Sequence, residues 1–177
     1  MRTDRPLIAP PRLVRAALAG AVAELRLPAG HPLTEAIPGD RLYLREEVHL
    51  EGRAGEPPTG AVYAIDGAPV DLGRFPAGKV LPPAFQPVRY PGAWAARLWF
   101  RIVRKHYHPL AQISEAEAIA EGIPPAPARP RGMPAWVAHP TARGDRLRFW
   151  DAEHPDHPAA GNPTALALTL APIDRPS

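Results

Sequence analysis

Residues 96–123 read ARLWFRIVRKHYHPLAQISEAEAIAEGI and predict a long strand that runs directly into a short helix. Leu98, Phe100 and Ile102 recur at every second position, the spacing that turns apolar side chains to one face of a strand. The opposite face of the same strand carries Arg97, Trp99, Arg101 and Val103. We therefore expect a strand over residues 96–107 with one core face and one polar face.

The helix that follows is marked at both ends. Ser114 is followed three residues later by Glu117, so the serine hydroxyl can accept the third helical N–H while the glutamate accepts the serine N–H. Gly122 then supplies the left-handed residue at which helices often stop. These signals predict a helix that begins after Ser114 and stops at Gly122.

Short strands and few helices make up the rest of the expected fold. A helix is predicted from Pro11 to Leu25, because proline suits the first helical position and apolar residues then recur at helical spacing. The remaining predictions are a strand over 41–48, a hairpin over 61–70 with Asp66-Gly67 at its turn, a short helix over 146–152 and a strand over 164–170. This order of elements indicates an α+β fold.

The chain has 177 residues, of which 26 are proline and none is cysteine. This length suits one core, so residues 1–177 are expected to form a single domain. Each proline removes an N–H donor, and the proline-rich segment over 123–145 is therefore expected to be a surface loop. The absence of cysteine excludes disulfides, thiolate nucleophiles and cysteine-ligated metals.

Charge and hydropathy narrow the class of partner. A net charge of +3 gives modest general attraction to nucleic acid. No apolar run approaches the ~20 residues that a membrane-spanning helix needs, so we expect a cytoplasmic protein without a membrane partner. An alternative interpretation takes Arg15 and the apolar residues 16–23 as a secretory signal, but this stretch is rich in alanine rather than leucine, and Asp4 precedes it.

Four segments match one known pattern when they are taken together. They are LAQISEAEAIAEGI at 110–123, GDRLYLRE at 39–46, FQP at 85–87 with WAAR at 94–97, and WD at 150–151 with NP at 162–163. These segments resemble the ASCH domain of the PUA-like superfamily, in the versions carried by phages and prophages. The resemblance implies a small, curved, PUA-like β-barrel with short helices at its rim and a cleft that faces RNA or a nucleotide.

The sequence departs from the catalytic pattern of this family. ASCH proteins that hydrolyse modified cytidines use a lysine, a threonine and a glutamate, and the matching positions here are Val22, Leu25 and Glu121. A threonine nucleophile needs a hydroxyl and a base to take its proton, and neither valine nor leucine provides one. Amidohydrolase activity is therefore not expected.

The residues expected in the cleft are Arg26, Tyr43, Arg45, Tyr90, Trp94 and Arg97. A guanidinium can bind a phosphate through two hydrogen bonds, and an aromatic ring can stack on a base. The alternative interpretation is that the arginines are solvated or pair with carboxylates, for which Glu46, Glu47 and Glu121 are the candidates.

We therefore expect a domain that binds RNA or a nucleotide and has lost any ancestral hydrolytic activity. Two other functions stay open at this point. One is a nuclease or modified-nucleoside hydrolase that uses Glu46 or Glu121, and the other is a scaffold that keeps the barrel without a ligand. No cofactor is expected, and the sequence indicates no particular protein partner.

Two histidine groups and the loop over 124–140 have interpretations of their own. The histidine groups are His106 with His108, and His154 with Asp156 and His157. Such side chains can bind a metal, but nothing in the sequence brings the two groups together, so no metal site is expected. The loop is expected to be a stiff connection, and the alternative is a polyproline ligand for a partner.

Overall fold

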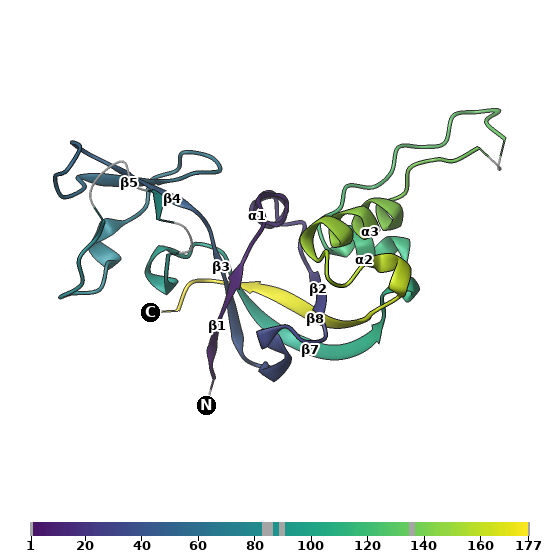
Figure 1. The fold of residues 1–177 in the computed structure, drawn as a ribbon, viewed down its shortest axis with the longest axis horizontal. Helices are drawn as coiled ribbons and strands as arrows, with labels where there is room; N and C mark the ends of the chain where they lie inside the picture. Colours follow the sequence, from purple (N-terminus) through teal and green to yellow (C-terminus); the bar gives the residue numbers. More distant parts are fainter. Residues whose placement is uncertain (1, 83–86, 89–90, 135–136, 177) are drawn as a thin grey trace. The chain divides into compact units, whose positions relative to one another are not determined.

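The computed structural model describes residues 2–82, 87–88, 91–134 and 137–176 (Figure 1). The chain divides into two compact units, and each is described by itself. Unit 1 contains residues 1–18, 39–101 and 172–177, and unit 2 contains residues 19–38 and 102–171. Strands and helices occur in both units, so the mixed α+β fold is confirmed.

Eight strands and three α-helices lie in the described residues. The strands are β1 (Asp4–Ile8), β2 (Glu24–Pro28), β3 (Arg41–Arg45), β4 (Val48–Glu51), β5 (Gly60–Tyr63), β6 (Pro87–Val88), β7 (Trp99–Pro109) and β8 (Thr164–Ile173). The helices are α1 (Pro11–Leu18), α2 (Glu115–Ala120) and α3 (Ala142–Glu153). One sheet has the order β1-β3-β7-β8-β2, and the other has the order β5-β4-β6. In this part of the chain the larger sheet has an open order, and the curved barrel stays a prediction.

In unit 1, β1 runs parallel to β3, and β3 runs antiparallel to the start of β7. Leu42 and Leu44 of β3 are buried on one face together with Phe100 of β7. The other face of β3 carries Arg41, Tyr43 and Arg45. This division into an apolar and a polar face is the one that the alternating pattern predicts.

The smaller sheet of unit 1 has its own core, formed by Val48, Leu50, Ala61, Tyr63, Val70 and Ala95. The predicted turn after β5 is present: Gly67 has a φ of +70°, and its N–H donates to the carbonyl oxygen of Tyr63 at 2.8 Å. The expected second strand of this hairpin is reduced to a single bridge between Val62 and Pro69, because proline donates no N–H to a ladder.

In unit 2, β2 pairs antiparallel with β8, and α2 packs against α3 (Figure 1). The residues buried between the two helices and their flanking turns are Ile113, Ala118, Ile123 and Ala142. Trp150 of α3 is fully buried in a second cluster with Leu110 and Ala165. The predicted start and stop of α2 are confirmed, since both hydrogen bonds of the capping box are present and Gly122 has a φ of +80°.

The predicted helix over 11–25 is wrong beyond Leu18, where α1 ends. Gly20 takes a φ of +69°, which turns the chain out of the helix, and a strand, β2, follows. A partner strand outweighs the helical spacing here, because Leu25 and Leu27 are buried beside β8. Sheet pairing thus overrides the local pattern.

Two further elements have boundaries that differ from the prediction. The strand expected over 41–48 is divided, since β3 ends at Arg45 and β4 begins at Val48 in the other sheet. The helix expected over 146–152 is longer, because the Thr141 hydroxyl accepts the N–H of Gly144 and starts α3 earlier. No helix in the part of the chain described has the length and apolar character that a membrane crossing requires.

Candidate functional site

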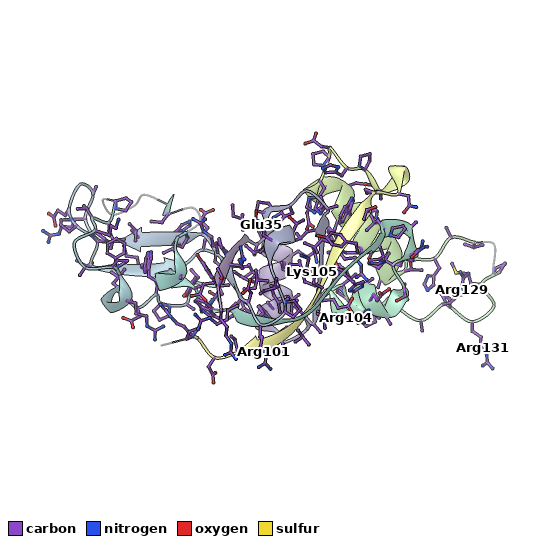
Figure 2. The ribbon with its side chains drawn as sticks, turned by 90° about the horizontal axis from the view of Figure 1, so that it is seen from below. Glu35, Arg101, Arg104, Lys105, Arg129 and Arg131 are labelled. Atoms are coloured by element: carbon purple, nitrogen blue, oxygen red, sulfur yellow. The ribbon has the colours of Figure 1, made fainter. Side chains whose placement is uncertain are left out.

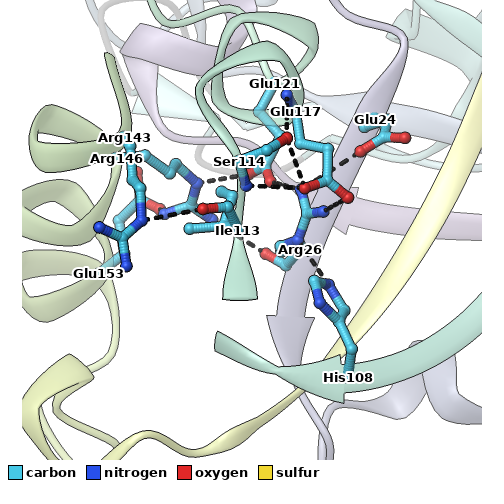
Figure 3. A network of polar contacts seen from close by, with 10 residues as sticks. All are labelled: Glu24, Arg26, His108, Ile113, Ser114, Glu117, Glu121, Arg143, Arg146 and Glu153. Atoms are coloured by element: carbon cyan, nitrogen blue, oxygen red, sulfur yellow. Dashed lines mark hydrogen bonds and ion pairs between the residues drawn. The ribbon is translucent and has the colours of Figure 1, made fainter. Parts of the chain in front are cut away.

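Unit 2 contains a buried network of charged side chains around Arg26 and Glu121 (Figure 3). Arg26 lies on β2, Glu121 lies at the C-terminal end of α2, and Arg146 lies on α3. An isolated bridge between Val22 and Glu121 brings the end of α2 against the segment that precedes β2. Arg26, Glu121 and Arg146 are 1%, 2% and 1% exposed, so the network is closed to solvent at its centre.

Arg26 uses every nitrogen of its guanidinium group. Its Nη2 donates to Glu117 Oε1 at 2.7 Å, and its Nη1 donates to Glu121 Oε1 and to Glu24 Oε2, the latter at 3.3 Å. Its Nε donates to His108 Nε2 at 2.8 Å. The alternative interpretation, in which this arginine pairs with carboxylates, is therefore the one that the structure shows.

Glu121 is held between two guanidinium groups. Its Oε1 accepts from Arg26 Nη1, and its Oε2 accepts from Arg146 Nε. A general base needs an accessible lone pair close to the proton that it removes. Both oxygens of Glu121 are engaged here, and the neighbouring Val22 and Leu25 are buried aliphatic residues. The geometry is that of a structural anion.

The network carries an excess of negative charge. Its four carboxylates belong to Glu24, Glu117, Glu121 and Glu153, and its two guanidinium groups belong to Arg26 and Arg146. With His108 neutral, four negative charges face two positive ones in these ion pairs, and Arg143, whose guanidinium group donates to the carbonyl oxygen of Ile113, adds a third positive charge (Figure 3). A phosphate group would be repelled rather than attracted by this set of charges.

His108 makes the stability of unit 2 depend on pH. Partial burial and the positive charge of Arg26 lower the pKa of His108 below its ordinary value of 6.5. As the pH falls through 6.5, the unfolded chain therefore takes up a proton more readily than the folded chain, and the free energy of unfolding decreases. His31 and His154 act in the same direction, because burial also lowers the pKa of each imidazole.

We expect His108→Gln to remove part of this pH dependence, because an amide does not titrate and its oxygen can still accept from Arg26. Urea unfolding of the wild type and the variant at pH 8 and pH 5.5 measures the effect. The wild type is expected to lose more stability between the two pH values than His108→Gln. An equal loss in both proteins would show that this imidazole does not couple to folding.

A second charged cluster lies in unit 1 around Arg97. Its Nη2 donates to Glu46 Oε2 at 2.8 Å, its Nε is 3.2 Å from both oxygens of Glu46, and its Nη1 donates to Asp66 Oδ2 at 2.8 Å. The guanidinium carbon lies 3.8 Å from the ring centroid of Tyr63, whose hydroxyl donates to the carbonyl oxygen of Ala95. The hydrogen bond from Arg97 lowers the pKa of Asp66. Arg97 and the buried Glu46 are therefore partners in an ion pair.

The polar face of β3 and β7 in unit 1 is the third feature. Arg41 of β3 lies directly opposite Arg101 of β7, and Tyr43 lies opposite Trp99. The rings of Tyr43 and Trp99 are in tilted contact, with centroids 5.0 Å apart. Arg45 Nε donates to the carbonyl oxygen of Pro91 at 3.1 Å. We call the face formed by Arg41, Tyr43, Arg45 and Arg101 the β3–β7 polar face.

The charges on the β3–β7 polar face are not balanced. Like charges directly opposite each other in a sheet are destabilising, and Arg41 is neutralised by an ion pair with Asp4. Arg101 is exposed and, within the described residues, its guanidinium group has neither a hydrogen-bond partner nor an ion-pair partner. The face therefore offers a free guanidinium group on the same side of the sheet as the ring of Tyr43.

The remaining predicted aromatic residues are placed in part. The ring of Trp94 meets that of Phe75 edge to face at 5.1 Å, and its carbonyl oxygen accepts from Arg175 Nη1 at 2.9 Å. Tyr90 lies outside the described residues. Trp94 thus belongs to unit 1, as do Tyr43, Arg45 and Arg97, whereas Arg26 belongs to unit 2.

The histidine groups form no metal centre in the described part of the chain, where no three His, Cys, Asp or Glu side chains come together in a suitable cluster. The rings of His106 and His108 stack on each other with centroids 5.3 Å apart. The rings of His154 and Trp150 meet edge to face, with their centroids 4.6 Å apart.

Several residues of these clusters are not identified by sequence reasoning, among them Arg101 and Arg146. The alternating pattern puts Arg101 on the polar face of its strand without distinguishing it as a binding residue, because the register that sets it opposite Arg41 is not given by the pattern of either strand. Arg146 has no such signal, because nothing in its local sequence shows that it reaches Glu121.

No family model matches the sequence, and no curated protein matches it. Among solved structures, the chain is similar to the crystal structure of protein EF3133 from Enterococcus faecalis V583, of family model DUF984. The identity is 10% and the TM-score is 0.47, and the match covers 100% of this chain and 84% of that chain. At this level of similarity we draw no functional argument from it.

Proposed function

We propose that this chain is an ASCH-type, PUA-like domain of phage or prophage origin that binds RNA or a nucleotide in the cytoplasm. The proposed contact surface is the β3–β7 polar face of unit 1, with Tyr43, Arg45 and Arg101 as its central residues. The proposal includes the curved barrel of this superfamily and excludes amidohydrolase activity. The support comes from the resemblance, the charge distribution and the unbalanced arginine pair.

The arginine pair on the β3–β7 polar face is the observation that carries the proposal. The sheet places Arg41 opposite Arg101, and the ion pair with Asp4 balances the charge of Arg41 only. The charge of Arg101 can therefore bind an anionic ligand. A guanidinium binds phosphate oxygens with well-aligned, charge-assisted hydrogen bonds. The ring of Tyr43, on the same face, offers a surface on which a base can stack.

The distribution of charge between the two units also favours unit 1 as the part that binds a polyanion. Within the ranges of unit 1 the sequence has 13 Lys and Arg residues against nine Asp and Glu, and within unit 2 it has eight against nine. The positive charge of the chain is therefore concentrated in unit 1. A polyanion is steered toward the more positive region, where counterions are released when it binds.

Both candidate catalytic glutamates are engaged by arginines. Glu46 forms the ion pair with Arg97, and Glu121 lies between Arg26 and Arg146. A general base must have an oxygen within reach of the proton that it removes, and the oxygens of both buried carboxylates are already occupied by guanidinium groups. These contacts favour a binding protein over a hydrolase.

We expect Arg101→Glu to weaken the binding of a fluorescein-labelled single-stranded RNA by about tenfold or more, since a charged hydrogen bond is worth about 1.5–3 kcal/mol. Fluorescence anisotropy between 50 and 200 mM salt measures the affinity. The slope of log affinity against log salt is expected to decrease by about 0.7 for each phosphate that the variant no longer binds. AMP and GMP are titrated in parallel to test for a single nucleotide as ligand.

Arg53→Glu is the matched control, because Arg53 is exposed in the same unit but lies in the turn after β4. Both variants change the net charge by the same amount, so a difference between them isolates the β3–β7 polar face. Equal effects of the two substitutions would contradict the assigned surface. A wild type that binds neither RNA nor nucleotide in a salt-dependent manner would contradict the proposed function and favour a scaffold.

A further inference from the structure

We call residues 124–140, between α2 and α3, the arm, and its described residues, 124–134 and 137–140, form a projecting loop (Figure 1). The sequence contains no acidic residue from Gly122 to Gly144, although it contains three arginines and one histidine. Six of the 17 arm residues are proline. An acid-free segment in a unit that is otherwise slightly acidic is a local concentration of positive charge.

The described residues of the arm are tied together by hydrogen bonds between its two limbs. Arg129 Nη1 donates to the carbonyl oxygens of Pro134 and Val137, at 2.8 and 3.1 Å. One ring nitrogen of His139, Nε2, lies 2.9 Å from the carbonyl oxygen of Pro127. Prolines and these cross-links restrict the backbone of the described arm residues, so these residues lose little conformational entropy when they bind a partner.

Arg131 lies at the outer turn of the arm. The N–H of Met133 donates to the carbonyl oxygen of Pro130 at 3.1 Å, and Gly132 has a φ of +84°, as the third residue of a type II turn requires. Arg131 is exposed, and in the described part of the chain no hydrogen bond or ion pair engages it. Figure 2 shows its side chain pointing outward at the end of the arm, with Arg129 nearer its base.

We propose that the arm is a second nucleic-acid contact, in which Arg131 binds a phosphate of a single-stranded RNA. This inference rests on the proposed function and adds a contact from unit 2. The free guanidinium fits a phosphate, and the neighbouring proline and methionine side chains offer apolar surface of the kind that nucleic-acid-binding arms place against bases and sugars.

The alternative partner for a proline-rich segment is a groove that recognises polyproline. Such grooves bind a single extended strand whose carbonyl groups are solvated and accessible. In the arm, the carbonyl oxygens of Pro127, Pro134 and Val137 are already engaged with the opposite limb. The paired limbs therefore favour recognition through the charged tip.

The test compares Arg131→Ala, Arg131→Lys and Arg148→Ala with the full-length wild type in the salt-dependent anisotropy experiment. Arg131→Ala is expected to reduce the salt slope for a 20-nucleotide single-stranded RNA by about 0.7 and to weaken binding about threefold to tenfold at 50 mM salt. Arg131→Lys keeps the charge and is expected to retain most of the slope. Arg148→Ala removes an exposed arginine of unit 2 that pairs with Asp145, and is expected to leave the slope unchanged.

The outcomes separate this inference from the proposed function. If the wild type binds and Arg101→Glu weakens binding, but Arg131→Ala has the slope of the wild type, the arm does not contact the strand and only this inference is overturned. If Arg148→Ala lowers the slope as much as Arg131→Ala, the effect reflects net charge and the inference is again overturned. If the wild type does not bind RNA, the proposed function itself is overturned.

Discussion

Replacing Glu121 with glutamine is expected to lower the free energy of unfolding by about 3–5 kcal/mol, the usual cost of leaving a buried charge without its partner. The carboxylate is 2% exposed and accepts from both Arg26 and Arg146. A neutral amide cannot balance two buried guanidinium groups, and its NH2 group would face N–H donors. Chemical denaturation followed by circular dichroism measures the loss.

Two further variants test whether the lost charge causes the loss of stability in Glu121→Gln. Glu56→Gln makes the same change at an exposed position and is expected to cost less than about 0.5 kcal/mol. A triple variant with Arg26→Met, Glu121→Leu and Arg146→Met removes all three central charges, and it is expected to be considerably more stable than Glu121→Gln. A Glu121→Gln protein as stable as the wild type would show that the network contributes nothing to folding.

Replacing Trp150 with alanine is expected to cost about 3–5 kcal/mol, the range for removing a large aromatic side chain from a core. Trp150 is fully buried with Leu110 and Ala165, and its Nε1 donates to the carbonyl oxygen of His157 at 2.6 Å. Thermal unfolding compares this variant with Trp150→Phe, which keeps an aromatic ring but removes the hydrogen bond. Phenylalanine is expected to cost about 1–3 kcal/mol. If Trp150→Ala lowers the free energy of unfolding by less than about 1 kcal/mol, either the neighbouring side chains fill the cavity or Trp150 is not part of a packed core.

The sequence predicts the fold best where a local pattern and the tertiary structure favour the same element. β7 and the start of α2 are predictable because side-chain alternation and a capping box are short-range signals. The predicted helix over 11–25 is wrong beyond Leu18 because residues 24–28 pair with β8. The two strands are more than 100 residues apart in the sequence. Long-range pairing of this kind leaves no mark within a short window.

The sequence predicts several residues of the candidate site, but it does not predict which side chains pair with one another. The sequence indicates Arg26 and Arg97 as residues of interest, with Glu121 and Glu46 as their possible partners. Arg26 and Glu121 are separated by 95 positions, so only the folded chain shows that their charges neutralise each other. Alternation in each strand predicts the β3–β7 polar face, but it does not predict the register that sets Arg41 opposite Arg101.

Glu117 joins two events that are usually separate during folding. One of its oxygens, Oε2, accepts from the backbone and hydroxyl of Ser114, whereas the other, Oε1, accepts from Arg26 on β2. The same carboxylate therefore completes the first turn of a six-residue helix and anchors that helix to a distant strand. A helix this short has little persistence in isolation, so its first turn and the docking of the strand should form and break as one cooperative step.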